Sequence, residues 1–176
     1  ITLSKLRLST DHILWDLGAG SGSVAVEAAL FIKKGRIFAI ERDMDRINHI
    51  TNNKKHFGVT NLEIVQAELP QGLADLPRPD RVFIGGGGKH LEDIIDAAGR
   101  FLRLHGIIVV NTVLIPNIHV ALNTLGRLGF ETDCIQIQIN RCQEMPWADR
   151  LEAQNPVWII TGIRKSEKMN SEGGTS

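Results

Sequence analysis

Cysteine is scarce in this chain, which has only Cys134 and Cys142 among its 176 residues. So few cysteines exclude a disulfide scaffold. They also lack a second Cys or His pair at the spacing that zinc sites use. We therefore expect both thiols to be reduced, as in the cytoplasm, and we predict no metal site.

An excess of charge of one sign is also absent. Lys and Arg together number 20, as do Asp and Glu, so the formal net charge is zero. Proteins that bind the phosphate backbone of nucleic acids normally carry a basic excess, so we expect no nucleic-acid partner. No apolar run approaches the roughly 20 residues of a membrane span, and no signal-peptide pattern is visible. We expect no membrane contact and a cytoplasmic location.

What the chain does contain is an alternation of strand and helix patterns. Five βα units are followed by two strand patterns with no helix pattern between them. This order predicts a doubly wound α/β fold, with a mostly parallel seven-stranded sheet and a C-terminal antiparallel strand pair. The ligand should bind beyond the carboxyl ends of the first, second and fourth strands, where the winding reverses. The predicted strands are 13–17, 36–40, 62–66, 81–84, 107–111, 135–139 and 157–163, and the predicted helices are 23–33, 43–56, 91–102 and 118–128.

The domain organisation predicted from these patterns is simple. We expect one domain over residues 1–164, followed by a polar, frayed tail over residues 165–176. Because the chain begins at Ile1 rather than Met, we expect it to be a piece of a longer polypeptide. The alternation of isoleucines over 135–139 leaves open whether these side chains face the core or an interface between subunits.

The most informative block runs from Asp16 to Gly22 and contains glycine at positions 18, 20 and 22. Glycines permit a tight turn and let a ligand approach the backbone. The helix that follows directs free amides at the same place, which favours a carboxylate or a phosphate. Glu41 ends the second predicted strand, where an acid can accept both ribose hydroxyls of a nucleoside. Turn and acid together predict an adenosine-type ligand.

The spacing of the glycines distinguishes between nucleoside cofactors. The dinucleotide fingerprint has glycine at its first, third and sixth positions, whereas here Ser23 holds the sixth position and Asp16 precedes the first glycine by two. This pattern resembles motif one of the class I S-adenosylmethionine-dependent methyltransferases, and the resemblance implies S-adenosyl-L-methionine as cofactor. It implies that Gly18, Ala19, Gly20, Ser21 and Gly22 line the methionine and ribose, that Asp16 helps to hold the methionine end, that Glu41 takes the ribose, and that Glu68 and Leu69 lie by the adenine.

The end of the fourth predicted strand indicates the target of the methyl group. It carries neither the Pro-Pro-aromatic motif of amino-group DNA methyltransferases nor the Pro-Cys nucleophile of cytosine-carbon enzymes. Instead it enters four consecutive glycines, 85–88. Such a run offers a flat wall where a broad, planar ligand can approach the methyl donor.

Several segments together carry a more specific signal: Leu3–Leu6, Leu14–Val24, Ala39–Arg42, Phe83–Gly87 and Asn155–Val157. In these segments the chain resembles the decarboxylating precorrin-6B (cobalt-precorrin-6B) methyltransferase family of cobalamin biosynthesis, and the likeness covers nearly all of residues 1–164. The resemblance implies methylation of carbon 15, a ring-bridging carbon, and removal of the acetate carboxyl on ring C as carbon dioxide. It also implies a homo-oligomer, with the tetramer typical of the family, and a chain that occurs alone, as a partner of the carbon 5 methyltransferase domain or fused behind it.

A precorrin is a large macrocycle with many carboxylates, so its cleft should carry cations and hydrogen-bond donors. The sequence does not assign a catalytic acid or base. The macrocycle itself supplies an electron-rich carbon and an electron sink, so we expect no Cys nucleophile, metal cluster or Ser-His-Asp arrangement. The expected substrate-facing residues are Gly85, Gly86, Gly87, Asn111, Thr112 and Arg141, with Lys89, His90 and Arg150 as further cations. Two alternatives stay open: another small class I methyltransferase acting on tRNA or protein carboxylates, and a non-catalytic nucleotide-binding domain that kept the fold.

Overall fold

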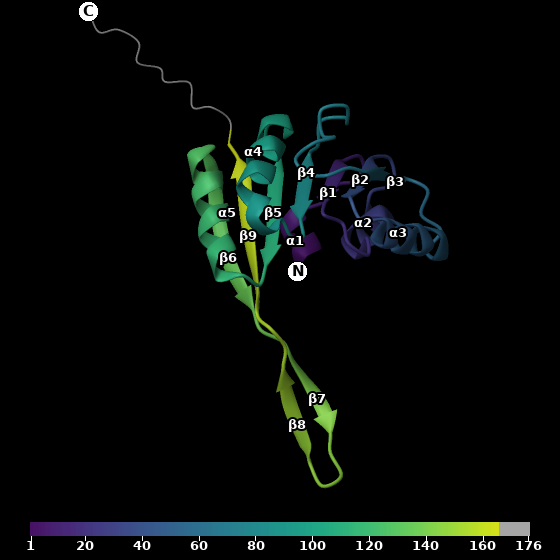
Figure 1. Ribbon diagram of the computed structural model, residues 1–176, viewed down its shortest axis with the longest axis vertical. Coiled ribbons are helices and arrows are strands. Elements are labelled where there is room, and N and C mark those ends of the chain that lie inside the picture. Colours follow the sequence, from purple (N-terminus) through teal and green to yellow (C-terminus); the bar gives the residue numbers. More distant parts are fainter. Residues whose placement is uncertain (166–176) are drawn as a thin grey trace, which may run out of the picture.

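A seven-stranded sheet organises the fold of this computed structural model, which describes residues 1–165 (Figure 1). The strand order is β3-β2-β1-β4-β5-β9-β6. The five parallel strands are β1 (Ile13–Leu17), β2 (Arg36–Glu41), β3 (Leu62–Gln66), β4 (Arg81–Ile84) and β5 (Ile107–Thr112). The last two, β6 (Phe130–Ile137) and β9 (Val157–Arg164), pair antiparallel, and β9 also pairs antiparallel with β5. The predicted doubly wound sheet and its antiparallel pair are confirmed.

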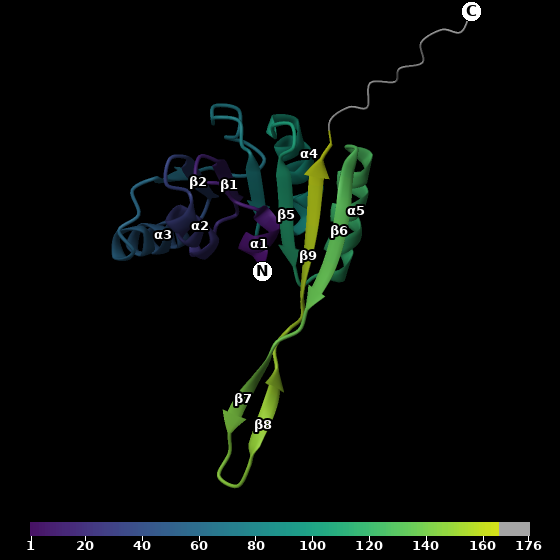
Figure 2. The ribbon, with the colours of Figure 1, turned by 180° about the vertical axis from the view of Figure 1, so that it is seen from behind.

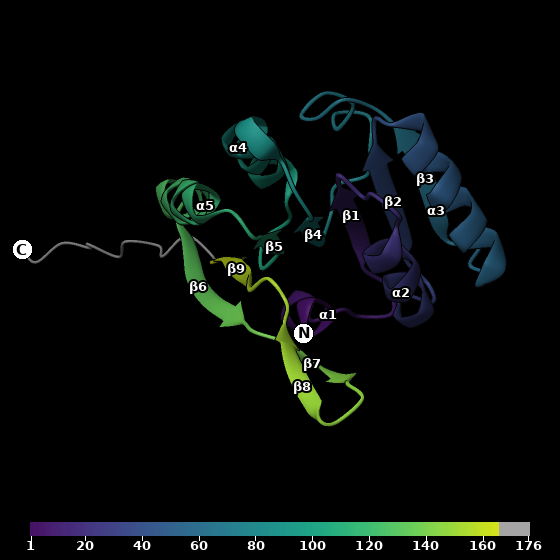
Figure 3. The ribbon, with the colours of Figure 1, turned by 60° about the horizontal axis from the view of Figure 1, so that its bottom comes forward.

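Helices cover both faces of the sheet (Figure 3). On one face, α4 (Leu91–Phe101) and α5 (Ile115–Arg127) pack against a core that includes Trp15 and Phe38. On the other face, α1 (Thr2–Leu6), α2 (Ser23–Phe31) and α3 (Met44–His56) contribute buried residues to a second core. Because the central strands are covered on both faces, they are hydrophobic throughout rather than alternating.

Some connections differ from the sequence-based prediction. No helix lies between β3 and β4, so four strands, not five, lead directly into a helix. Three prolines in the connecting segment 67–80 oppose a helix there. Helix α5 begins at Ile115, before the predicted 118, with Pro116 in its first turn, a position that proline favours. Strand β6 begins at Phe130 rather than at 135, and α1, only five residues long, was not predicted at all.

A two-stranded hairpin, also not predicted, projects away from the sheet (Figures 1 and 2). It consists of β7 (Asn140–Glu144) and β8 (Asp149–Ala153), which pair only with each other. Every residue in both strands is exposed. With no buried side, the sequence has no apolar alternation that would reveal these strands.

Within residues 1–165, no helix has the length and apolar character that a membrane crossing requires. The tail predicted over 165–176 lies, apart from Lys165, outside the described residues.

Candidate functional site

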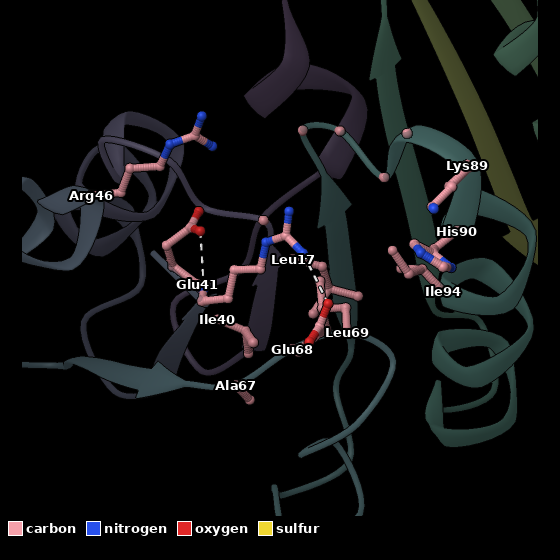
Figure 4. Close-up of a pocket in the computed structure, with 16 residues that line it drawn as sticks. Leu17, Ile40, Glu41, Arg46, Ala67, Glu68, Leu69, Lys89, His90 and Ile94 are labelled. Carbon is pink, nitrogen blue, oxygen red and sulfur yellow. Dashed lines mark hydrogen bonds and ion pairs between the residues drawn. The ribbon is translucent and has the colours of Figure 1, made fainter. Parts of the chain in front are cut away.

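A pocket of about 360 Å³ opens at the carboxyl ends of β1, β2 and β4, the place predicted from the reversal of the winding. Figure 4 shows Glu41 and Arg46 on the side of β2 and α3, and Lys89 and His90 on the opposite side. Lys89 and His90 belong to η1 (Gly88–His90), the short helix before α4. We call this the charged pocket, because its lining includes the ionisable residues Glu41, Arg42, Arg46, Glu68, Lys89 and His90.

The glycine turn between β1 and α2 has the backbone that its composition predicts. Gly18, Gly20 and Gly22 have φ angles of 73°, 60° and 74°, a region that favours glycine. A Cβ on Gly18 or Gly20 would meet no atom within 4 Å, so the space beside these two residues is open. A Cβ on Gly22 would instead lie 2.9 Å from Ile50 of α3, so this glycine is needed for packing.

Most amides of this turn already donate within the protein. The N–H groups of Gly18 and Ala19 donate to the Ile40 carbonyl oxygen at 3.0 and 3.1 Å, and that of Gly22 donates to the Ala19 carbonyl at 2.8 Å. Ser21 is exposed, and its carbonyl accepts a hydrogen bond from the Asn53 side chain at 2.9 Å. The turn and first helical residues that keep an unpaired amide, within the described chain, are Ser21, Ser23 and Val24.

Glu41 fastens this turn to β2. Its side chain is buried, with Oε2 accepting from the Gly20 amide at 2.9 Å and Oε1 accepting from the amides of Arg42 and Asp43 at 2.9 and 3.1 Å. A carboxylate can accept about four hydrogen bonds, so Glu41 retains capacity for a ligand. It also lines the charged pocket, so it joins the turn, the strand and the pocket.

Asp16 lies beneath the turn and does not line the pocket. Its Oδ2 accepts from the Ala25 amide at 3.1 Å, whereas its buried Oδ1 has no hydrogen-bond partner. Burial raises the pKa of Asp16 to about 7; the Ala25 amide opposes this rise and the negative charge of Glu41 adds to it. Asp16 therefore braces the first turn of α2 from below.

Glu68 and Leu69 line the charged pocket at the end of β3, as does Arg42 at the end of β2. The Arg42 guanidinium and the Glu68 carboxylate form an ion pair at 2.9 Å, with side chains 70% and 67% exposed. Sequence reasoning missed Arg42 and Arg46. Arg42 precedes α3 and Arg46 lies in its first turn, so no helical spacing relates the two residues and no local pattern indicates that both reach the site.

A second pocket, of about 280 Å³, shares Gly85, Gly86 and Gly88 with the first. The glycine run therefore forms a common wall, although Gly87 lines only the charged pocket. We call the second one the uncharged pocket, because no ionisable side chain lines it. Its other lining residues are the predicted Asn111 and Thr112, together with Val113, Leu114, Asn117 and Val157, which sequence reasoning missed.

Two predicted cations lie away from both pockets. Arg141 is on β7 and Arg150 is on β8, and neither lines a pocket. The Arg150 Nε donates to the Gln143 side chain within the hairpin at 2.8 Å. The fold of a single chain therefore does not bring these two arginines to the site.

Comparison with known proteins shows which family this chain is related to. The family model described as a precorrin methyltransferase domain matches residues 1–163. The probable cobalt-precorrin-6B C(15)-methyltransferase (decarboxylating) of Pyrobaculum calidifontis is 40% identical over 163 residues, which cover 92% of this chain and 83% of that protein. The cobalt-precorrin-6B C(15)-methyltransferase (decarboxylating) of Salmonella typhimurium is 35% identical over 161 residues, which cover 91% and 83%.

The fold agrees with these sequence matches. The crystal structure of precorrin-6y C5,15-methyltransferase from Geobacter metallireducens superimposes with a TM-score of 0.88 at 43% sequence identity, covering 93% of this chain and 85% of that one. The seven-stranded sheet with its antiparallel final strands is the class I methyltransferase arrangement. The chain belongs to the precorrin methyltransferase domain family.

Proposed function

We propose that this chain is an S-adenosylmethionine-dependent carbon methyltransferase of cobalamin biosynthesis. Its substrate is a precorrin or cobalt-precorrin macrocycle, which it methylates at carbon 15 and from which it removes the ring C acetate carboxyl. The observation that carries this proposal is a charged pocket and an uncharged pocket that share three glycines, in a chain of this family. One pocket suits a zwitterionic nucleoside, and the other admits a broad ligand beside it.

The charged pocket fits S-adenosyl-L-methionine. Open space beside Gly18 and Gly20 lets a ligand reach the backbone, and the Glu41 carboxylate, which keeps a free acceptor position, takes the ribose through a hydroxyl. Leu69 and Glu68 border the adenine. When bound, S-adenosylmethionine supplies an electrophilic methyl group on its sulfonium. The unpaired amides that hold the methionine carboxylate at the start of α2 are those of Ser21, Ser23 and Val24.

The protein contributes positioning rather than a catalytic nucleophile. Carbon methylation requires an electron-rich carbon held in line with the sulfonium methyl, and the wall of Gly85 and Gly86 lets a planar ligand come close without side-chain obstruction. Beside the same wall, Lys89 provides a cation and His90 a hydrogen-bonding side chain for peripheral carboxylates of the macrocycle. Asn111 and Thr112 line the uncharged pocket, which shares this wall.

The activity is tested by incubating the protein with S-adenosylmethionine and precorrin-6B or its cobalt form. The product should gain about 14 mass units from methyl transfer and lose about 44 as carbon dioxide. A product that gains the methyl group but keeps its carboxyl would remove the decarboxylase part alone. Activity on tRNA or isoaspartyl peptides, with none on either macrocycle, would select the alternative methyltransferase.

We also propose that the chain is a homo-oligomer, a tetramer as the resemblance implies, held together through the β7–β8 hairpin. An isolated two-stranded hairpin is marginally stable in water. This one exposes Trp147 by 83% and Leu151 by 71%. Light scattering should therefore give an oligomer for the wild type and a smaller mass for the double variant Trp147→Ser, Leu151→Ser. The matched variant Phe57→Ser, Leu104→Ser, with two exposed apolar residues elsewhere, should keep the wild-type mass, and a monomeric wild type would contradict the proposal.

Two further parts of the proposal concern a second domain and the cellular location of the enzyme. The name C5,15-methyltransferase of the Geobacter relative supports a second domain, specific for carbon 5, that is fused to this chain or partners it. Cys134 and Cys142 are free thiols, which supports a location in the reducing cytoplasm. Sequencing the gene upstream of the codon for Ile1 tests the fusion directly.

A further inference from the structure

We infer that the uncharged pocket receives the carboxylate that leaves as carbon dioxide, and that the absence of charge in this pocket promotes its loss. The inference rests on the proposed function and adds a place and a cause for its second reaction. Both reactions occur on one rigid, planar ligand. When the methylated carbon lies over the glycine wall, a neighbouring substituent on the same ring system reaches across that wall, because the two pockets share Gly85, Gly86 and Gly88.

No side chain of the uncharged pocket offers a carboxylate a positive charge. None of its lining residues is ionisable, and Val113, Leu114 and Val157 are apolar. Its polar side chains, Asn111, Thr112 and Asn117, are neutral, and the Asn111 side-chain nitrogen uses one of its protons on the Thr2 hydroxyl at 2.8 Å. Hydrogen bonds from neutral donors stabilise a carboxylate less than hydrogen bonds from a cation do.

The first turn of α5, which begins at this pocket, is a poor anion site. A helix N-terminus normally offers up to four unpaired amides to an anion. Here the Leu114 amide donates to Thr112 Oγ1 at 3.0 Å, and Pro116 has no N–H. The Asn117 amide donates to the Leu114 carbonyl at 3.1 Å. Most of the donors that would hold a carboxylate at this helix end are therefore used or missing.

The macrocycle itself completes the pocket. Val113 and Leu114 are 55% and 52% exposed, so a broad ligand lying on them would cover apolar surface and exclude water from the pocket. Removing water destabilises an ionised carboxylate far more than neutral carbon dioxide. The bond between the methylene carbon and the carboxyl carbon breaks, and its electron pair enters the conjugated macrocycle as carbon dioxide leaves. When the ligand moves off the pocket and water returns, a water molecule gives a proton to the methylene carbon, which becomes a methyl group, and hydroxide remains.

Placing a cation in the uncharged pocket tests this assignment. The variant Leu114→Lys should bind the macrocycle more tightly, because the ammonium stabilises the carboxylate, and should release carbon dioxide at least about tenfold more slowly. KM and kcat for carbon dioxide release should therefore fall together, and cofactor affinity should stay unchanged. Val113→Lys adds the same charge to the same pocket from a second exposed position and should behave likewise.

Matched variants distinguish the effect of the added charge from the effects of side-chain size and of position in the chain. Leu114→Met is of similar length without charge and should not lower KM. Ile115→Lys adds the charge one residue farther on, at a side chain that is 67% exposed and does not line the pocket, and should leave both KM and kcat as in the wild type.

Two failures are distinguishable. If the wild type neither methylates the macrocycle nor releases carbon dioxide, the proposed function fails and this inference fails with it. If the wild type does both, but Leu114→Lys and Val113→Lys release carbon dioxide at the wild-type rate or raise KM, only the inference is overturned.

Discussion

The charged and uncharged pockets share one backbone wall but differ in the side chains around it. Six ionisable residues line the charged pocket, namely Glu41, Arg42, Arg46, Glu68, Lys89 and His90. None lines the uncharged pocket. Charged side chains bind a polar ligand, whereas a site without charged side chains favours reaction steps in which the negative charge of the ligand becomes delocalised. Under the proposed function, the glycine run lies between the cofactor and the carboxyl group that is lost, so changes at the cofactor end of the charged pocket should affect the cofactor and changes in the uncharged pocket should affect the macrocycle.

The largest effect is expected for Gly20→Val, on the cofactor side alone. Gly20 has a φ of 60°, which a branched residue adopts only with strain, and its new side chain would fill the space that the cofactor needs. Affinity for S-adenosylhomocysteine should fall by about 100-fold or more, as measured by titration calorimetry. A variant that binds as tightly as the wild type would mean that the ligand approaches elsewhere.

Glu41→Ala should have the next largest effect. Removing a buried acceptor costs about 1–3 kcal/mol, so cofactor affinity should fall by roughly 5- to 150-fold. Stability should also fall, because the amides of Gly20, Arg42 and Asp43 lose their partner. Glu27→Ala, an exposed acid on α2, is the matched control and should change neither quantity. Equal affinities for the two variants would show that Glu41 does not contact the ribose.

Asp16 gives a pH-dependent prediction. Its folded-state pKa of about 7 lies above the ordinary value of 3.8, so the folded protein binds more protons than the unfolded chain between these values. Stability from this group is complete below about pH 4 and is lost as the pH rises through 7. Between pH 5 and pH 8 the wild type should lose roughly 2–3 kcal/mol more than Asp16→Asn in urea unfolding. If the unfolding free energies of the two proteins changed with pH in parallel, this would contradict a raised pKa for the Asp16 carboxyl.

Thr112→Val changes the uncharged pocket and tests whether the two pockets are independent. Thr112 is buried, lines the uncharged pocket and accepts the Leu114 amide. Losing this hydrogen bond should cost about 1 kcal/mol of unfolding free energy and raise the KM for the macrocycle. Cofactor affinity should not change, and a parallel loss of cofactor binding would show that the two pockets are not independent.

The smallest effect is expected for Glu68→Gln. An exposed ion pair such as that of Glu68 with Arg42 contributes about 0–1 kcal/mol. Cofactor affinity should therefore change by less than about fivefold in calorimetry. A larger loss would show that the carboxylate contacts the adenine directly.

Sequence reasoning predicted the parts of the molecule that burial and backbone geometry dictate. The central strands are apolar because both faces are covered, and the turn at Gly18 and Gly20 requires positive φ angles that glycine supplies. The predicted position of Glu41 at the end of the second strand is confirmed, as is the predicted start of the last strand at Val157.

Other features depend on contacts that no local pattern records. The β7–β8 hairpin has no buried side, so its strands carry no apolar alternation. Val113 and Leu114 reach the site only because β5 ends beside the glycine run, and local sequence does not reveal that two distant loops meet there. Arg42 and Arg46 line the charged pocket through the direction in which α3 leaves β2.

A crystal structure of the protein with S-adenosylhomocysteine tests the central claim most directly. The account predicts density for the nucleoside in the charged pocket, with a ribose hydroxyl donating to the Glu41 carboxylate and the amino-acid carboxylate at the start of α2. Density for the ligand at another place, or none in the pocket while the glycine turn and Glu41 are well ordered, would contradict it.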